Sequence, residues 1–157
     1  MKNQYKIGFY ALSNYLQEVY KVKIFLQNGV DDAWYPELRN IFINKNYAWR
    51  ERLIALLHES GHVQMDLDTI CSKRMKISHV EFDYSSGYIQ SKDQFVYLLN
   101  EELAAWSLGK KLVDSLDIKI DEKILKKSIT NCIMSYVKFG LKSVYKKTIN
   151  IDSIFIK

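Results

Sequence analysis

The chain has 157 residues, of which 48% are hydrophobic, and a formal net charge of +5. This length fits one domain with a sizeable core, so we expect residues 1–157 to form a single unit. The chain has no signal-like start and no run near the roughly 18 apolar residues that span a bilayer, which predicts a cytoplasmic protein with no membrane partner. The two cysteines, Cys71 and Cys132, lack metal-ligand spacing and are expected to be reduced thiols, with Cys132 in the core.

The hydrophobic pattern predicts helices and short strands in an order typical of an α+β fold. The expected elements are a helix at 5–20, strands at 22–27 and 40–44, and helices at 48–65, 94–116 and 121–142. Asn28-Gly29 signals a turn, and Pro36 restricts its segment to a sheet edge because it lacks a backbone donor. Asp93 is expected to cap its helix, and residues 66–92 are expected to be irregular. The prediction is a small β-sheet packed on several helices.

The expected helix at 48–65 carries the HExxH arrangement His58-Glu59-Ser60-Gly61-His62. Because a helix has about 3.6 residues per turn, His58 and His62 project from one face and can bind one zinc ion. Glu59 is rotated about 100° around the axis, where it is placed to take a proton from metal-activated water. Gly61 lets another element pack closely. The pattern predicts a zincin-like active-site helix with Zn²⁺ as cofactor; the competing interpretation is two unrelated histidines.

A catalytic zinc site needs a third protein ligand, and two candidates are weak on sequence grounds. Asp68 stands ten residues after His58, but Met65 occupies the position where that ligand pattern requires a glycine. His79 has no ligand spacing around it and is more typical of a structural or surface histidine.

The stronger candidates, Glu101 and Glu102, lie together on the expected helix at 94–116. A carboxylate on a second helix packed across the first would complete the ligand set. Glu102 is favoured because it shares a helical face with the small residues Ala105 and Gly109, which suits close packing. Glu101 is the alternative third ligand, and both could instead be solvated carboxylates near a helix start.

Three linked features resemble the ImmA/IrrE family of metallo-endopeptidases. They are the strand at 40–44, the helix segment Leu56-Leu57-His58-Glu59-Ser60-Gly61-His62 and the later pattern Glu102-Leu103-Ala104-Ala105. The resemblance implies that His58, His62 and Glu102 hold zinc and that Glu59 is the general base. It also implies a bacterial, phage or mobile-element origin and a protein or peptide substrate, often a transcriptional regulator. The segment Trp106-Ser107-Leu108-Gly109 departs from the aromatic and alanine-rich run usual at this place.

A peptidase of this kind usually has a second electrophile, for which the candidates are Tyr84, Tyr88 and His79, each of them also compatible with a surface role. Ile41–Ile43 could align an extended peptide by strand addition, or form an ordinary core strand. Asp66 or Asp68 could orient a ligand histidine, although a solvated position is simpler.

The C-terminal third is rich in lysine. Its lysines include Lys123, Lys126, Lys127, Lys138, Lys142, Lys146 and Lys147. A solvated face is the simpler interpretation, and direct nucleic-acid binding is less favoured because arginines are not interleaved. The alternative function is a catalytically inactive zincin-fold module that binds a protein partner or regulator through this basic helical face.

Overall fold

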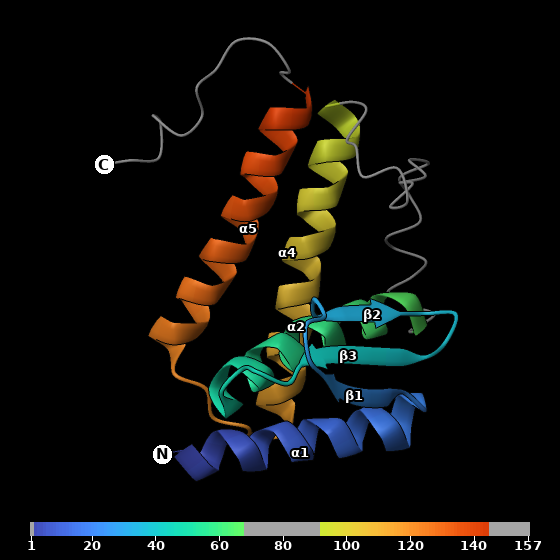
Figure 1. Ribbon diagram of the computed structural model, residues 1–157, viewed down its shortest axis with the longest axis vertical. Coiled ribbons are helices and arrows are strands. Elements are labelled where there is room, and N and C mark those ends of the chain that lie inside the picture. Colours follow the sequence, from blue (N-terminus) through green and yellow to red (C-terminus); the bar gives the residue numbers. More distant parts are fainter. Residues whose placement is uncertain (1, 68–91, 145–157) are drawn as a thin grey trace.

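The computed structural model describes residues 2–67 and 92–144 (Figure 1). Its elements are α1 (Lys2–Tyr20), β1 (Lys23–Gln27), β2 (Ala33–Tyr35), β3 (Asn40–Asn44), α2 (Trp49–Leu67), α4 (Lys92–Ser115) and α5 (Glu122–Val144). The expected α+β fold, with a small sheet packed on helices, is confirmed. Most of the segment expected to be irregular lies outside the described residues. Within them, no helix is long and apolar enough to cross a membrane.

The sheet has the strand order β1-β3-β2, with β1 parallel and β2 antiparallel to β3. Alternation along β3 buries Ile41 and Ile43 completely, which directs one face of the sheet toward the helices. Because β3 is paired on both sides, the expectation that Ile41–Ile43 aligns a peptide by strand addition is wrong. Strand β2 is one of the two edge strands of the described sheet and ends immediately before Pro36, as the missing backbone donor predicts.

The core forms where α1 and the sheet pack against α2 (Figure 1). Apolar side chains of α1, including Phe9 and Leu12, lie against the fully buried Leu53 and Leu56 of α2. Helical spacing of these residues concentrates the apolar surface of each helix on one side, and burial of each such side chain contributes on the order of 1.5–3 kcal/mol. Helix α2 is therefore packed on one side against α1 and the sheet.

The opposite side of α2 crosses α4 at very short range, through two glycines. A Cβ added to Gly61 would lie 1.9 Å from the backbone oxygen of Ala105, and one added to Gly109 would lie 2.0 Å from the backbone oxygen of Leu57. The two helix backbones are therefore in contact at the crossing. The close packing expected for Gly61 is confirmed, and it brings the middle of α4 over the HExxH turn.

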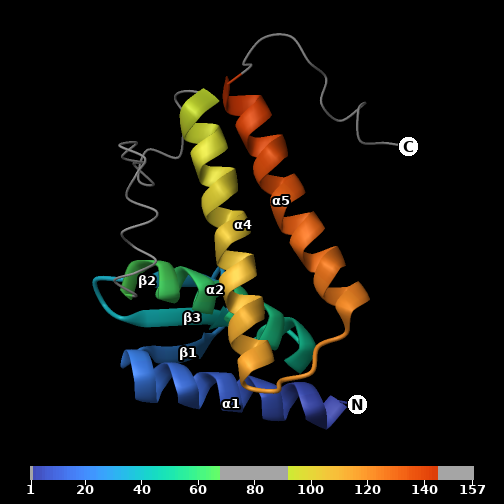
Figure 2. The same ribbon diagram turned by 180° about the vertical axis from the view of Figure 1, so that it is seen from behind.

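Helices α4 and α5 lie side by side in both views and extend beyond the sheet (Figures 1 and 2). The side chain of Asp121 accepts hydrogen bonds from the backbone N–H groups of Lys123 and Ile124, which caps the start of α5. The cap expected at Asp93 is wrong, because α4 begins at Lys92 and includes Asp93 in its first turn. The negative charge there still interacts favourably with the helix N-terminus.

Candidate metal centre and its cleft

The residues His58, His62 and Glu102 meet where α2 crosses α4. The Nε2 atoms of the two histidines are 3.3 Å apart. Oε2 of Glu102 lies 3.1 Å from Nε2 of His58, and Oε1 lies 3.7 Å from Nε2 of His62. One ligand atom from each side chain lies within 4.8 Å of the other two, so this cluster could hold a metal ion.

Burial makes this arrangement unfavourable without a cation. Glu102 is 5% exposed and His58 is 8% exposed. Among the described residues, the buried Oε2 of Glu102 has no hydrogen-bond partner apart from the imidazoles that it faces. Buried polar atoms without partners cost free energy, and a metal ion bound among these lone pairs would remove that cost. The residues therefore fit a metal in both donor chemistry and placement.

The protonation states also suit metal binding. Burial lowers the pKa of His62 to about 4, and the charge of His58 acts in the same direction. Burial alone would raise the pKa of Glu102, but its hydrogen bond with His58 and the charges of both histidines bring that pKa below its ordinary value. Near neutral pH the cluster therefore offers a neutral His62 imidazole and an ionised Glu102 carboxylate, the forms that ligate metals.

An aromatic side chain from α4 fixes the first histidine. The ring of Trp106 lies against the imidazole of His58, with ring centroids 4.3 Å apart and planes inclined by 36°. Trp106 is itself buried. This contact restricts rotation of the His58 ring.

Glu59 lies beside the cluster but outside the ligand set. Burial raises the pKa of Glu59 to about 7; the charge of His58 opposes this rise, and the carboxylates of Glu102 and Asp32 add to it. A hydrogen bond from the backbone N–H of Trp34 holds the Glu59 carboxylate. A carboxyl group with a pKa near neutral pH is suited to accept and release a proton.

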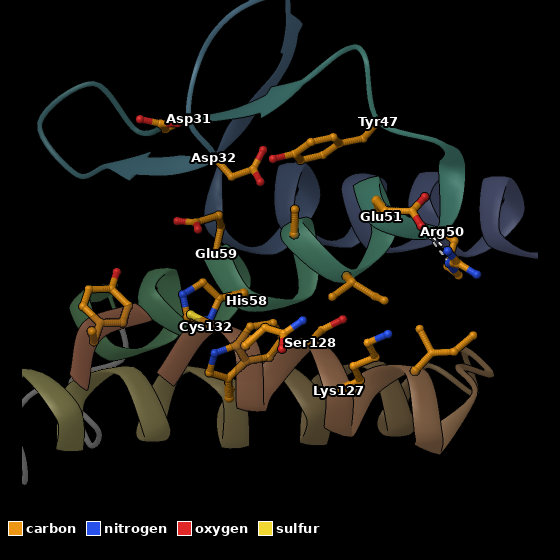
Figure 3. A pocket seen from close by; sticks show the side chains of 16 residues that line it. Asp31, Asp32, Tyr47, Arg50, Glu51, His58, Glu59, Lys127, Ser128 and Cys132 are labelled. Atoms are coloured by element: carbon orange, nitrogen blue, oxygen red, sulfur yellow. Dashed lines mark hydrogen bonds and ion pairs between the residues drawn. The ribbon is translucent and has the colours of Figure 1, made fainter. Parts of the chain in front are cut away.

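Two cavities, of about 720 and 530 Å³, meet at this centre. The two cavities share four of their lining residues, which are Asp32, His58, Glu59 and Tyr136. Figure 3 shows the larger cavity, with Asp32 on the loop above Glu59, and Lys127 and Cys132 on the α5 side. The smaller cavity runs along β2 past Trp34. The cluster therefore lies in the middle of a continuous cleft rather than at the bottom of a closed pocket.

Asp32 and Tyr136 are site residues that the sequence did not reveal. Asp32 Oδ1 accepts a hydrogen bond from the backbone N–H of Asn44 at 2.9 Å, which fixes the loop before β2. Tyr136 comes from α5, and burial raises the pKa of its phenol, so the hydroxyl stays protonated and donates to Glu102. Neither residue belongs to a local motif. Both reach the site only because of the tertiary arrangement.

The remaining sequence candidates fall into four groups. Glu101 lines the smaller cavity but is not a member of the ligand cluster, so the structure favours Glu102. Asp66 accepts a hydrogen bond from the indole of Trp34 at 2.6 Å, so this carboxylate binds Trp34 and not a ligand histidine. Cys132 is a free thiol, half-buried on the cavity wall and packed against the hydrophobic core that it was expected to join. The candidates outside the described residues are Asp68, Cys71, His79, Tyr84 and Tyr88.

Comparison with known proteins adds no assignment. The chain matches no protein-family model, and neither the curated proteins nor the solved structures gave a match. Inference about function therefore rests on the geometry of the site.

Proposed function

We propose that the chain is a zinc-dependent endopeptidase of the ImmA/IrrE type, with His58, His62 and Glu102 as metal ligands. The observation that carries this proposal is the convergence of two imidazoles and one carboxylate in a buried position inside a cleft. Three protein ligands with access from a cleft are typical of catalytic zinc, whereas structural zinc sites are closed by four.

A bound zinc ion would supply a Lewis acid that polarises the scissile carbonyl and lowers the pKa of water toward about 7. Glu59 accepts a proton from the attacking water as the new carbon–oxygen bond forms. It then donates that proton to the leaving amine as the carbon–nitrogen bond breaks. The Trp34 N–H orients the Glu59 carboxylate during both steps. The protonation cycle is balanced, because the proton taken from water is returned to the product amine.

The edge strand β2 suggests how a substrate is aligned. Within the described residues β2 is paired on one side alone, with β3, and its residues Ala33 and Trp34 line the smaller cavity. An extended peptide that adds to the free side of β2 would pass directly over Glu59. The two cavities would then receive side chains from either side of the scissile bond. The substrate class is thus an extended protein segment; that it comes from a transcriptional regulator stays a prediction from the resemblance.

The proposal is tested by zinc content and peptide cleavage measured on the same preparations. Wild type and Glu59→Gln should each bind about one zinc per chain, and His58→Ala should lose it. Cleavage of an extended-peptide library should fall by about 10²–10⁴-fold in Glu59→Gln, since general base catalysis contributes on that order. Glu18→Gln, an exposed change on α1, is the matched control and should cleave normally.

Two results would contradict the proposal. A wild-type protein that binds no zinc after reconstitution has no metal centre. A protein that binds zinc but cleaves no peptide, with wild type and Glu59→Gln behaving alike, would instead be the catalytically inactive binding module.

A further inference from the structure

Helix α5 supplies no metal ligand, yet it lines the larger cavity and reaches the smaller one at Tyr136. Cys132 and Tyr136 line the cavities, and Gly140 follows on the same face, since these residues are spaced by four. A Cβ on Gly140 would lie 2.2 Å from Cε2 of Phe95, so α5 approaches α4 closely at that level. At the other end, Cys132 lies beside Trp106. The contact between α4 and α5 thus includes both Phe95 and Trp106 of α4.

Tyr136 stands between these two contacts, at the level of Glu102. Its side chain is partly buried, borders both cavities and makes a hydrogen bond with the Glu102 carboxylate. In metal sites, carboxylate ligands are themselves held by hydrogen bonds from the surrounding protein. Removing the hydroxyl would leave Glu102 free to rotate away from the histidines.

We propose that Tyr136 is a positioning residue that orients Glu102 for metal binding, and that through it the docking of α5 on α4 sets the metal affinity of the site. This inference rests on the metal centre of the proposed function. It makes α5 an integral part of that centre, since the three ligands come from α2 and α4 alone.

The test compares zinc affinity in wild type, Tyr136→Phe and Tyr10→Phe, by competition with a chromophoric chelator. Tyr136→Phe keeps the ring that packs in the α4–α5 contact and removes only the hydroxyl. Its zinc dissociation constant should rise by about 10–100-fold, as for other residues that support a metal ligand. Tyr10 is exposed on α1, and its phenylalanine variant should bind zinc as wild type does.

Cobalt(II) in place of zinc gives a readout that a purely structural role would not move. The ligand-field absorption of the Co²⁺ protein should change in Tyr136→Phe, because the Glu102 carboxylate is differently oriented, while the melting temperature of the metal-free protein stays near wild type. Equal zinc affinity and an identical cobalt spectrum in wild type and Tyr136→Phe would overturn the inference. That outcome differs from failure of the proposed function, in which the wild type itself binds no metal.

Discussion

The carboxyl group of Glu59 is buried, which makes its ionisation unfavourable, and the stability of the fold therefore depends on pH. Its pKa rises from 4.5 to about 7 on folding, so the folded chain binds this proton more tightly than the unfolded chain. The contribution of the protonated Glu59 side chain to the free energy of unfolding is therefore fully present below pH ~4.5 and is lost as pH rises through about 7. At about 1.4 kcal/mol per pKa unit, the loss at pH 8 is roughly 3–4 kcal/mol in the metal-free protein.

Glu59→Gln cannot ionise and should escape this loss. In the presence of a chelator, we expect the variant to be more stable than wild type at pH 8, with a difference that shrinks toward pH 5. Urea unfolding at both pH values measures it. His62 acts in the opposite sense, since its pKa falls to about 4 on folding, but it is common to both proteins and cancels in the comparison. Equal stability at pH 8 would show that Glu59 is not desolvated.

Some residues of the candidate site can be predicted from the sequence, and others cannot. His58, Glu59 and His62 are within two turns of one helix, so helical periodicity alone places their side chains. Glu102 was reachable because small residues on its face implied a close helix crossing. Tyr136 and Asp32 were not, because a residue acquires such a role only from the packing of distant elements.

The elements themselves were predictable to within a few residues wherever the apolar period was clear. Helices α1, α2, α4 and α5 and strands β1 and β3 all match predicted segments. Strand order was not predictable, because pairing of β3 with both β1 and β2 depends on contacts between strands and not on the pattern within any one. The wrong expectation that a peptide pairs with Ile41–Ile43 has the same cause, because the alternating pattern of β3 is the same for an edge strand and for a central strand.

The crossing of α2 and α4 makes a prediction at the level of elements. In Gly61→Ala the new Cβ would meet the backbone oxygen of Ala105 at 1.9 Å, and no rotamer change can relieve a backbone contact. The helices must separate, which should cost about 1–3 kcal/mol in unfolding free energy. Because separation also moves Glu102 away from the histidines, zinc affinity should fall in the same variant.

Thermal melts and zinc titrations of Gly61→Ala test this, with Ser107→Ala as the control. Ser107 is an exposed position of α4, where alanine is a better helix former than serine, so stability should hold or rise slightly. Unchanged stability and zinc affinity in Gly61→Ala would mean that the two helices are not in contact at this point.

At the scale of the whole molecule, the metal centre joins helices that are far apart in the sequence. The histidines come from α2, which is packed on α1 and the sheet, whereas Glu102 comes from α4, which lies against α5 (Figures 1 and 2). A metal bound between them would therefore link the two halves of the fold. Since an ion that binds only the folded state stabilises it by mass action, zinc should raise the stability of the entire described unit.

This prediction also decides between the two glutamates. With free zinc at 100 times its dissociation constant, the unfolding free energy of the wild type should rise by about 2.7 kcal/mol. Glu102→Gln should lose most of this rise, while Glu101→Gln should keep it, because Glu101 lines the cleft without joining the ligand cluster. Both variants remove one carboxylate from adjacent positions of the same helix, so each controls for the charge change in the other. The reverse result, with the response lost only in Glu101→Gln, would mean that α4 is rotated about its axis relative to α2 and that the ligand assignment must change with it.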